Sequence, residues 1–194
     1  GAFAPSDPNV AWVGDLAGRV YRSADGGDTW GQVTPLPSVD GVGEVDAIAV
    51  HPTTPGTVLV GVYAQGAFVP PIELLFRTID SGVSWTHIGA DIQDAAGHRV
   101  GVRAIEFDRM NPDRLFAGTD VGVWVSTNGG TSWAVFNEGL PNARVADLTY
   151  EPRRQLLRAG LWGRGVYERH VGAATAKDVR LHVRTSTLDD GWNQ

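Results

Sequence analysis

Three eight-residue stretches decide how this chain folds: Ser23-Ala24-Asp25-Gly26-Gly27-Asp28-Thr29-Trp30, Thr78-Ile79-Asp80-Ser81-Gly82-Val83-Ser84-Trp85 and Ser126-Thr127-Asn128-Gly129-Gly130-Thr131-Ser132-Trp133. They align without gaps, and their tryptophans lie 55 and 48 residues apart. Self-similarity at a period of ~20–50 residues is the signature of a repeat architecture. The chain is therefore expected to consist of successive structural units of similar size.

Each stretch has the residues of a tight hairpin turn. The acidic or amide side chain can accept hydrogen bonds from backbone N–H groups a few residues on, the glycine two residues later permits a positive φ, and the hydroxyl residues offer further local bonds. The tryptophan is expected to begin the next strand and to bury its ring between neighbouring units. The turn residues are Ser23, Asp25, Gly27, Thr29 and Trp30; Thr78, Asp80, Gly82, Ser84 and Trp85; and Ser126, Asn128, Gly130, Ser132 and Trp133. Calcium binding is the alternative reading, but a calcium loop needs several acidic ligands and each turn supplies one or none, so a structural turn is favoured.

The segments around the turns repeat as well. Each unit has an apolar run, a turn, a second apolar run, a loop and a third run before the hairpin turn; Ala47–Val50, Thr57–Gly61 and Leu74–Arg77 are one such set. Four short antiparallel strands per unit predict an all-β fold, a β-propeller of four-stranded blades. The predicted blades are residues 1–45, 46–100, 101–144 and 145–170, with the last ending near Glu168 after three strands. Residues 171–194 are interpreted as a linker and the start of a C-terminal extension, with a strand over 178–184.

About four blades are present, and an open propeller would leave long sheet edges that proteins avoid. The chain is therefore expected to be part of a larger propeller, completed by upstream blades or by other subunits.

The composition argues against several classes of function. The 194 residues carry a net charge of −6, which argues against nucleic-acid binding, and no apolar run is long enough for membrane insertion. There is no cysteine, which removes disulfides and thiolate chemistry. No cofactor or metal site is expected, because the histidines have no metal-ligand spacing; they are His51, His87, His98, His170 and His182.

With its three turns in register, the chain resembles the Asp-box (BNR-repeat) propeller superfamily over about residues 1–170. That superfamily includes sialidases, xyloglucanase-type glycoside hydrolases, sortilin-like receptor domains and photosystem-assembly propellers. Residues 161–168 resemble the closing strand of bacterial secreted members, so the resemblance implies an extracytoplasmic location, secreted or periplasmic. The superfamily is functionally mixed, and its fold does not define an activity.

Candidate functional residues lie on the face opposite the hairpin turns, where two loops are long, about 63–73 and 89–100. Loops on a rigid scaffold commonly carry binding residues. This favours a non-catalytic recognition or scaffold surface whose partner is a protein or a glycan. The candidate binding residues are Tyr63, Gln65, Phe68, Asp91, His98, Arg99, Trp162 and Arg164; the alternative is that the long loop is a variable insertion and that Trp162 packs between blades.

Glycoside hydrolysis is the competing hypothesis, with an active site partly outside this segment. It requires two carboxyl groups ~5–10 Å apart, and Asp46 and Asp147 stand near the starts of predicted innermost strands, whereas Glu106 is interior to its strand. Arg103 and Arg144 occupy plausible positions for a sialidase arginine triad, but the Phe-Arg-Ile-Pro motif of sialidases is absent from this stretch. Asp46 and Asp147 could equally be solvated residues at loop–strand junctions.

Overall fold

The computed structural model describes residues 1–37, 43–63, 74–172 and 180–182. In these ranges the chain forms sixteen strands in four sheets and no helix. Blade 1 consists of β1 (Ala2–Ala4), β2 (Asp7–Gly14), β3 (Val20–Ser23) and β4 (Gly31–Gln32), and blade 2 of β5 (Glu44–Val50), β6 (Val58–Tyr63), β7 (Leu75–Thr78) and β8 (Thr86–His87). Blade 3 consists of β9 (Val102–Phe107), β10 (Leu115–Thr119), β11 (Gly122–Ser126) and β12 (Ala134–Val135), and blade 4 of β13 (Val145–Glu151), β14 (Leu156–Leu161), β15 (Gly165–His170) and β16 (Arg180–His182).

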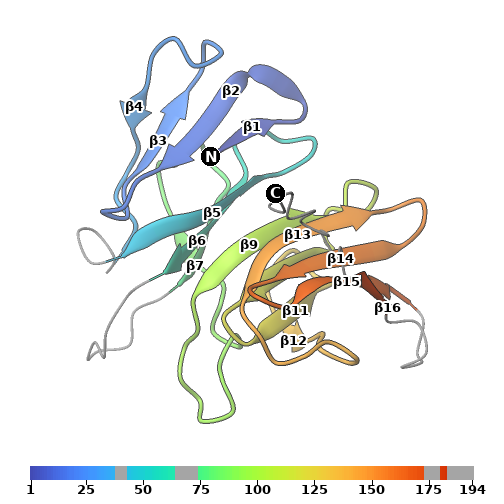
Figure 1. The fold of residues 1–194 in the computed structure, drawn as a ribbon. Coiled ribbons are helices and arrows are strands. Elements are labelled where there is room, and N and C mark those ends of the chain that lie inside the picture. Colours follow the sequence, from blue (N-terminus) through green and yellow to red (C-terminus); the bar gives the residue numbers. More distant parts are fainter. Residues whose placement is uncertain (38–42, 64–73, 173–179, 183–194) are drawn as a thin grey trace, which may run out of the picture.

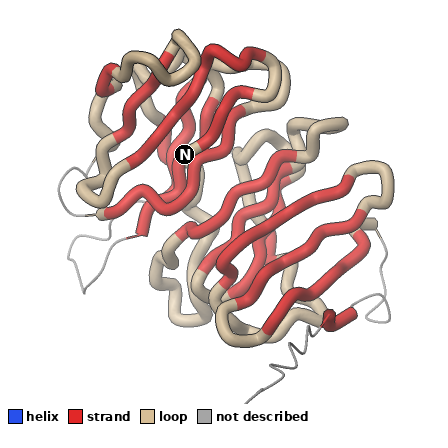
Figure 2. Tube along the Cα trace, turned by 45° about the horizontal axis from the view of Figure 1, so that its top comes forward, coloured by secondary structure: helices blue, strands red, loops and turns tan. Residues whose placement is uncertain are grey.

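Within each blade the strands pair antiparallel in chain order. The first strands, β1, β5, β9 and β13, contact one another in succession, so the four sheets are arranged around a common axis (Figure 1). The tube view shows strands joined by loops and turns in the described residues (Figure 2). The predicted all-β fold with four-stranded antiparallel blades is confirmed.

Apolar side chains fill one layer between each pair of consecutive blades. Neighbouring residues of a strand point to opposite faces, so Val60 belongs to the layer between blades 1 and 2 and Leu59 to the layer between blades 2 and 3. Phe76 and Phe116 are fully buried in the first and third layers. Burial of such a side chain stabilises the fold by about 1.5–3 kcal/mol. These layers hold the blades in order.

The three hairpin turns are closed by corresponding hydrogen bonds, except that the Asn128 amide donates to the Ser132 hydroxyl where Asp25 and Asp80 accept from a hydroxyl. In the second turn, the Thr78 hydroxyl donates to Asp80 at 2.7 Å, and Asp80 accepts the backbone N–H of Ser84 at 2.9 Å and the hydroxyl of Ser84 at 2.5 Å. The first turn repeats these bonds around Asp25. In the third turn Asn128 accepts the N–H of Ser132 at 3.0 Å. Each turn therefore closes on itself through its own side chains.

The three turn tryptophans precede β4, β8 and β12, but their surroundings differ. The indole Nε1 of Trp85 donates to the carbonyl oxygen of Thr34 in blade 1 at 2.9 Å. Trp133 donates in the same way to Ile88 of blade 2 at 2.8 Å. Trp30 donates to Gly27 within its own turn at 2.9 Å and is 41% exposed. The expectation that each ring is buried between blades therefore does not hold for Trp30, because none of the described residues form a blade ahead of blade 1.

The fourth blade extends further than the sequence patterns indicated. β16 pairs with β15, with Leu181 opposite Tyr167, so the strand expected within a C-terminal extension is the outermost strand of blade 4. The physical reason is that β15 would otherwise end the sheet with unpaired backbone groups. No helix long and apolar enough to cross a bilayer is found in the described part of the chain.

Candidate functional site

Two β-bulges place charged side chains at the same end of the innermost strands. The pairing of β5 with β6 shifts between Val45 and Ala47, and the pairing of β9 with β10 shifts at Gly118 and Thr119. Asp46 and Arg103 are the extra residues at these shifts. A bulge redirects the side chain of its extra residue, and here it brings residues of blades 2 and 3 together.

The Arg103 guanidinium is held from three sides. Nη1 lies 2.7 Å from Asp46 Oδ2, Nε lies 2.9 Å from Asp120 Oδ1, and the guanidinium carbon lies 3.5 Å from the centroid of the Tyr63 ring. The Arg103 side chain is 7% exposed. Burial is the largest effect on its pKa and lowers it, but hydrogen bonding and charge attraction from Asp120 and Asp46 raise the pKa above its usual value. Arg103 is therefore a fixed cation that joins blades 2 and 3.

A second, more open pair lies beside it on blade 4. Arg144 Nε is 3.8 Å from Asp120 Oδ1, and the Arg144 guanidinium lies 5.1 Å from the centroid of the Trp162 ring. The backbone N–H of Trp162 donates to the carbonyl oxygen of Arg144 at 2.9 Å. Trp162 is 69% exposed. An exposed ring stacked against a half-exposed cation provides a flat, amphipathic contact surface.

Together these residues form what we call the Arg103 cluster: Asp46, Tyr63, Arg103, Asp120, Arg144 and Trp162. They lie where the first strands begin and the second strands end, because Tyr63 closes β6, Asp120 follows β10 and Trp162 follows β14. The hairpin turns follow the third strands, which run parallel to the first, so the cluster is on the opposite face. With two arginines and two aspartates its formal charge is balanced.

Other predicted binding residues are not members of the Arg103 cluster. Asp91 accepts the backbone N–H of Trp133 at 3.0 Å, a contact between blades 2 and 3 beside the third turn. Exposed His98 pairs with Asp94 at 3.1 Å, and Arg99 donates to the carbonyl oxygen of Gly89 at 3.2 Å, both within the loop after β8. Arg164 is exposed in the turn between β14 and β15. Gln65 and Phe68 lie outside the described residues.

The two carboxylates proposed as a catalytic pair lie on different innermost strands. Asp46 is on β5 and is paired with Arg103, whereas Asp147 is on β13, with β9 between the two strands. The charged neighbour of Asp147 is Glu106 on β9. Burial is the largest effect on the pKa of Glu106 and, with the negative charge of Asp147, raises it; the N–H of Tyr150 and the charge of Arg109 oppose that rise.

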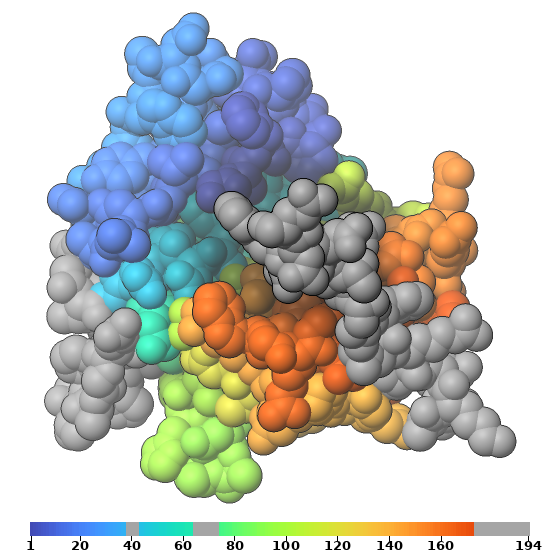
Figure 3. Space-filling view, in the orientation of Figure 1, coloured from blue at the N-terminus to red at the C-terminus, as the bar shows by residue number. Residues whose placement is uncertain are grey.

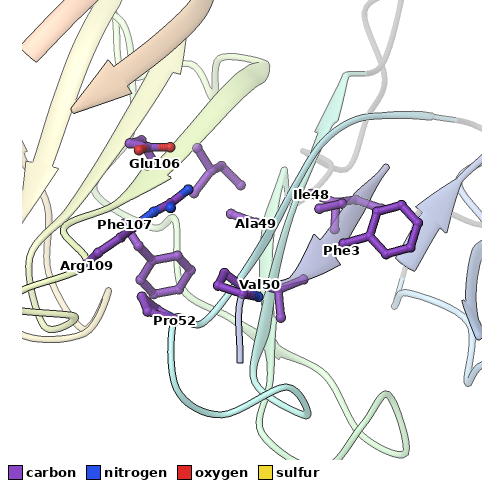
Figure 4. Close-up of a pocket in the computed structure, with 11 residues that line it drawn as sticks. Phe3, Ile48, Ala49, Val50, Pro52, Glu106, Phe107 and Arg109 are labelled. Atoms are coloured by element: carbon purple, nitrogen blue, oxygen red, sulfur yellow. The ribbon is translucent and has the colours of Figure 1, made fainter. Parts of the chain in front are cut away.

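Glu106 also lines a cavity of about 140 Å³ on the axis side of blades 1, 2 and 3. Phe3, Val50 and Phe107 form its apolar walls, and Glu106 and Arg109 supply its charges (Figure 4). Sequence patterns did not assign this cavity or Asp120. Asp120 could have been found by aligning the second strands on Gly61, Gly118 and Gly160, because Tyr63, Asp120 and Trp162 each stand two residues further on. Among the described residues, no group of three or more histidine and acidic side chains is arranged to hold a metal ion.

No protein-family model matches this chain, and no curated protein matches it. Solved structures do match. A Niastella koreensis GH74 enzyme superposes with a TM-score of 0.68 at 17% identity over 89% of this chain and 28% of that one. YCF48 bound to D1 peptide superposes with a TM-score of 0.60 at 18% identity, over 86% of this chain and 50% of that one. The Myceliophteria thermophila Cps50 (Swd1) β-propeller domain superposes with a TM-score of 0.58 at 13% identity, over 90% of this chain and 53% of that one.

These similarities show that the fold is a β-propeller, and the chain spans between 28% and 53% of the length of these three structures. The matched proteins include an enzyme and propellers not described as enzymes, so the fold is compatible with catalysis and with binding.

Proposed function

We propose that this chain is part of a non-catalytic recognition propeller that binds a protein or a glycan through the face carrying the Arg103 cluster. The observation that carries the proposal is the exposed Trp162 ring stacked against Arg144 and backed by the buried Arg103. Rigid aromatic rings lose little conformational entropy on binding. YCF48, which has this fold, was solved bound to a peptide, which supports peptide recognition as a use of the fold.

In this proposal Asp46 and Arg103 hold the binding surface in place and do not take part in catalysis. A carboxylate already paired with a buried guanidinium is a poor general base, because transfer of a proton to it would break that pair. The same ion pair fixes Tyr63 and Asp120, and Asp120 in turn lies close to Arg144. Fixing these side chains before binding reduces the entropy lost on association.

A direct test is selection of ligands on the intact chain from a displayed peptide library and, separately, from a glycan array. Binders should lose at least tenfold in affinity for Trp162→Ala and keep their affinity for Val135→Ala, a change at an exposed apolar residue on β12. Ligands that keep their affinity for Trp162→Ala and bind the hairpin-turn face would refute the proposed surface.

Membership of the Asp-box superfamily and an extracytoplasmic location are part of the same proposal. The shared hydrogen bonds of the three turns support the first, and the second depends on the resemblance. Fractionation of the native source, with the protein found only in the cytoplasm, would refute the location.

Glycoside hydrolysis is the second candidate, with part of the active site supplied from outside this segment. The observation that favours it is the Glu106–Asp147 pair, in which one carboxyl group has a raised pKa and the other stands nearby. Two carboxyl groups in unlike environments are the usual acid and base of such enzymes. Turnover of a chromogenic glycoside or of xyloglucan that is lost in Glu106→Gln would establish this function over recognition.

A further inference from the structure

The cavity on the axis side of blades 1, 2 and 3 lies at the end of the innermost strands that is nearest the hairpin turns. Val50 and Phe107, which line it, are the last residues of β5 and β9, and Arg109 belongs to the turn that follows β9. That turn is bonded to the third hairpin turn, because the backbone N–H of Gly129 donates to the carbonyl oxygen of Asp113 at 2.9 Å. The cavity is therefore on the face opposite the proposed binding surface.

The walls of the cavity are parts of the folded core. They come from three successive blades, and Figure 3 shows the blue residues of blade 1 packed on the cyan residues of blade 2. Val50 and Phe107 are each 6% exposed and belong to the apolar layers between blades. The rings of His51 and Phe107 meet edge to face, with their centroids 5.4 Å apart. Walls that are already fixed reduce the entropy that a ligand loses on binding.

The size and lining of the cavity limit what it can hold. Its volume is about 140 Å³, and an apolar cavity of about 150 Å³ holds a molecule of benzene. In the close-up, Phe3 and Ile48 lie on one side of the cavity and Glu106 and Arg109 on the other (Figure 4). A ligand that matches this lining has a small apolar group at one end and polar groups at the other.

The two charged residues of the lining are both suited to a ligand. Burial raises the pKa of Glu106, and the charge of Asp147 adds to the rise, although the N–H of Tyr150 and the charge of Arg109 oppose it. The carboxylate therefore lacks a full countercharge, and a ligand cation beside it would stabilise its ionised form. Arg109 is exposed, and a planar guanidinium matches the geometry of a carboxylate.

We propose that this cavity binds an α-amino acid with an apolar side chain, with the ammonium group on Glu106, the carboxylate on Arg109 and the side chain against the apolar walls. A zwitterion complements both charges of the lining. An amine alone would be repelled by Arg109, and a carboxylic acid alone by Glu106. The side chain is a branched aliphatic group or a single ring, because the apolar part of the cavity has the size of benzene. This second site does not depend on the ligand proposed for the Arg103 cluster.

A ligand-observed NMR titration of the intact chain with L-phenylalanine tests the site. Three analogues each remove one recognised group: 3-phenylpropionate lacks the ammonium group, L-phenylalaninamide carries a neutral amide in place of the carboxylate, and L-alanine lacks the ring. We expect each analogue to bind more weakly than L-phenylalanine by about tenfold or more. No binding of L-phenylalanine, or equal binding of any one analogue, would overturn the proposal.

Variants then show where L-phenylalanine binds. Glu106→Gln and Arg109→Gln should each weaken its binding by about tenfold or more, with thermal unfolding measured in parallel to show that each variant is folded. The matched controls are Glu138→Gln and Arg154→Gln, at side chains that are 54% and 69% exposed and do not line the cavity; they should leave the affinity unchanged. Unchanged affinity in either cavity variant would overturn the proposal. A loss of binding in Trp162→Ala would also overturn it, because the ligand would then lie on the opposite face.

Discussion

Arg103 and Asp46 come from neighbouring blades, and their side chains meet at 2.7 Å between Nη1 and Oδ2. The contact depends on a bulge in each first strand, so it is built by the backbone as well as by the side chains. It pairs Asp46, one of the candidate catalytic residues, with a buried cation. The exposed Arg144–Trp162 pair next to it is the part of the cluster available to a ligand.

Replacement of Arg103 by methionine should destabilise the protein by about 2–4 kcal/mol, because it leaves Asp46 and Asp120 close together without their shared cation. Urea denaturation gives the free energy of unfolding. The matched control is Arg154→Met, which removes a cation that is 69% exposed and 3.4 Å from Glu151; it should change stability by less than about 1 kcal/mol. Equal losses in the two variants would contradict the role assigned to Arg103.

Gly82→Ala should be more costly than Gly26→Ala, although both glycines have positive φ, 85° and 79°. A left-handed conformation costs a residue with a Cβ about 1–2 kcal/mol, and only at Gly82 would the new methyl also press on Val33. Thermal or urea unfolding of the two variants measures the difference. A larger loss of stability for Gly26→Ala than for Gly82→Ala would contradict the close packing of the second turn against Val33 of blade 1.

The acidic turns predict a specific loss of stability in acid. Hydrogen bonds from the Ser84 hydroxyl and backbone N–H, followed by the Thr78 hydroxyl, lower the pKa of Asp80 from 3.8 to about 2, and bonds from Thr29 and Ser23 lower the pKa of Asp25 further. Because the folded-state pKa values lie below the unfolded ones, the stabilisation is present above pH 3.8 and is lost as the pH falls toward the folded values.

The double variant Asp25→Asn, Asp80→Asn reproduces the chemistry of the third turn, where Asn128 already serves as the acceptor. Its melting temperature should fall less steeply than that of the unmodified chain between pH 4 and pH 2. Parallel curves for the two proteins would show that these carboxylates contribute nothing to the acid response.

The ionisation of Glu106 should change the stability of the fold in the opposite direction. Burial raises its pKa in the folded state, so charging it costs stability as the pH rises above its unfolded value of 4.5, and this cost is complete once the pH exceeds the folded pKa. Glu106→Gln should therefore stabilise the protein at pH 8 more than at pH 4. Glu138→Gln, at a side chain 54% exposed beside Arg169, serves as the control, and a gain from Glu106→Gln that is independent of pH would contradict the burial argument.

The fold could be predicted from the sequence because the turn residues act locally. Ser23, Asp25 and Thr29 bond to one another within seven residues, so their spacing alone indicates a hairpin in each unit. Trp30 shows the limit of that reasoning, because burial of its ring depends on a neighbouring blade and not on the turn.

The site was predicted only in part for a related reason. Tyr63 and Trp162 were identified as exposed-face aromatics, but the bulges that turn Asp46 and Arg103 toward each other leave no mark in residue periodicity. Asp91 was assigned to binding because it lies in a long loop, whereas the structure places its carboxylate on the backbone of Trp133. Contacts between blades come from residues about 40–60 positions apart, as with Asp46 and Arg103, separated by 57, and no local pattern reports them.

The central claim is that the Trp162–Arg144 pair is the recognising surface and the buried Arg103 pair its support. The most direct measurement is the affinity of one selected peptide or glycan for four proteins: the original chain, Trp162→Ala, Arg144→Ala and the control Val135→Ala. The account predicts at least tenfold weaker binding, about 1.4 kcal/mol, for the first two variants and unchanged binding for the control. Equal affinity for all four proteins would contradict it.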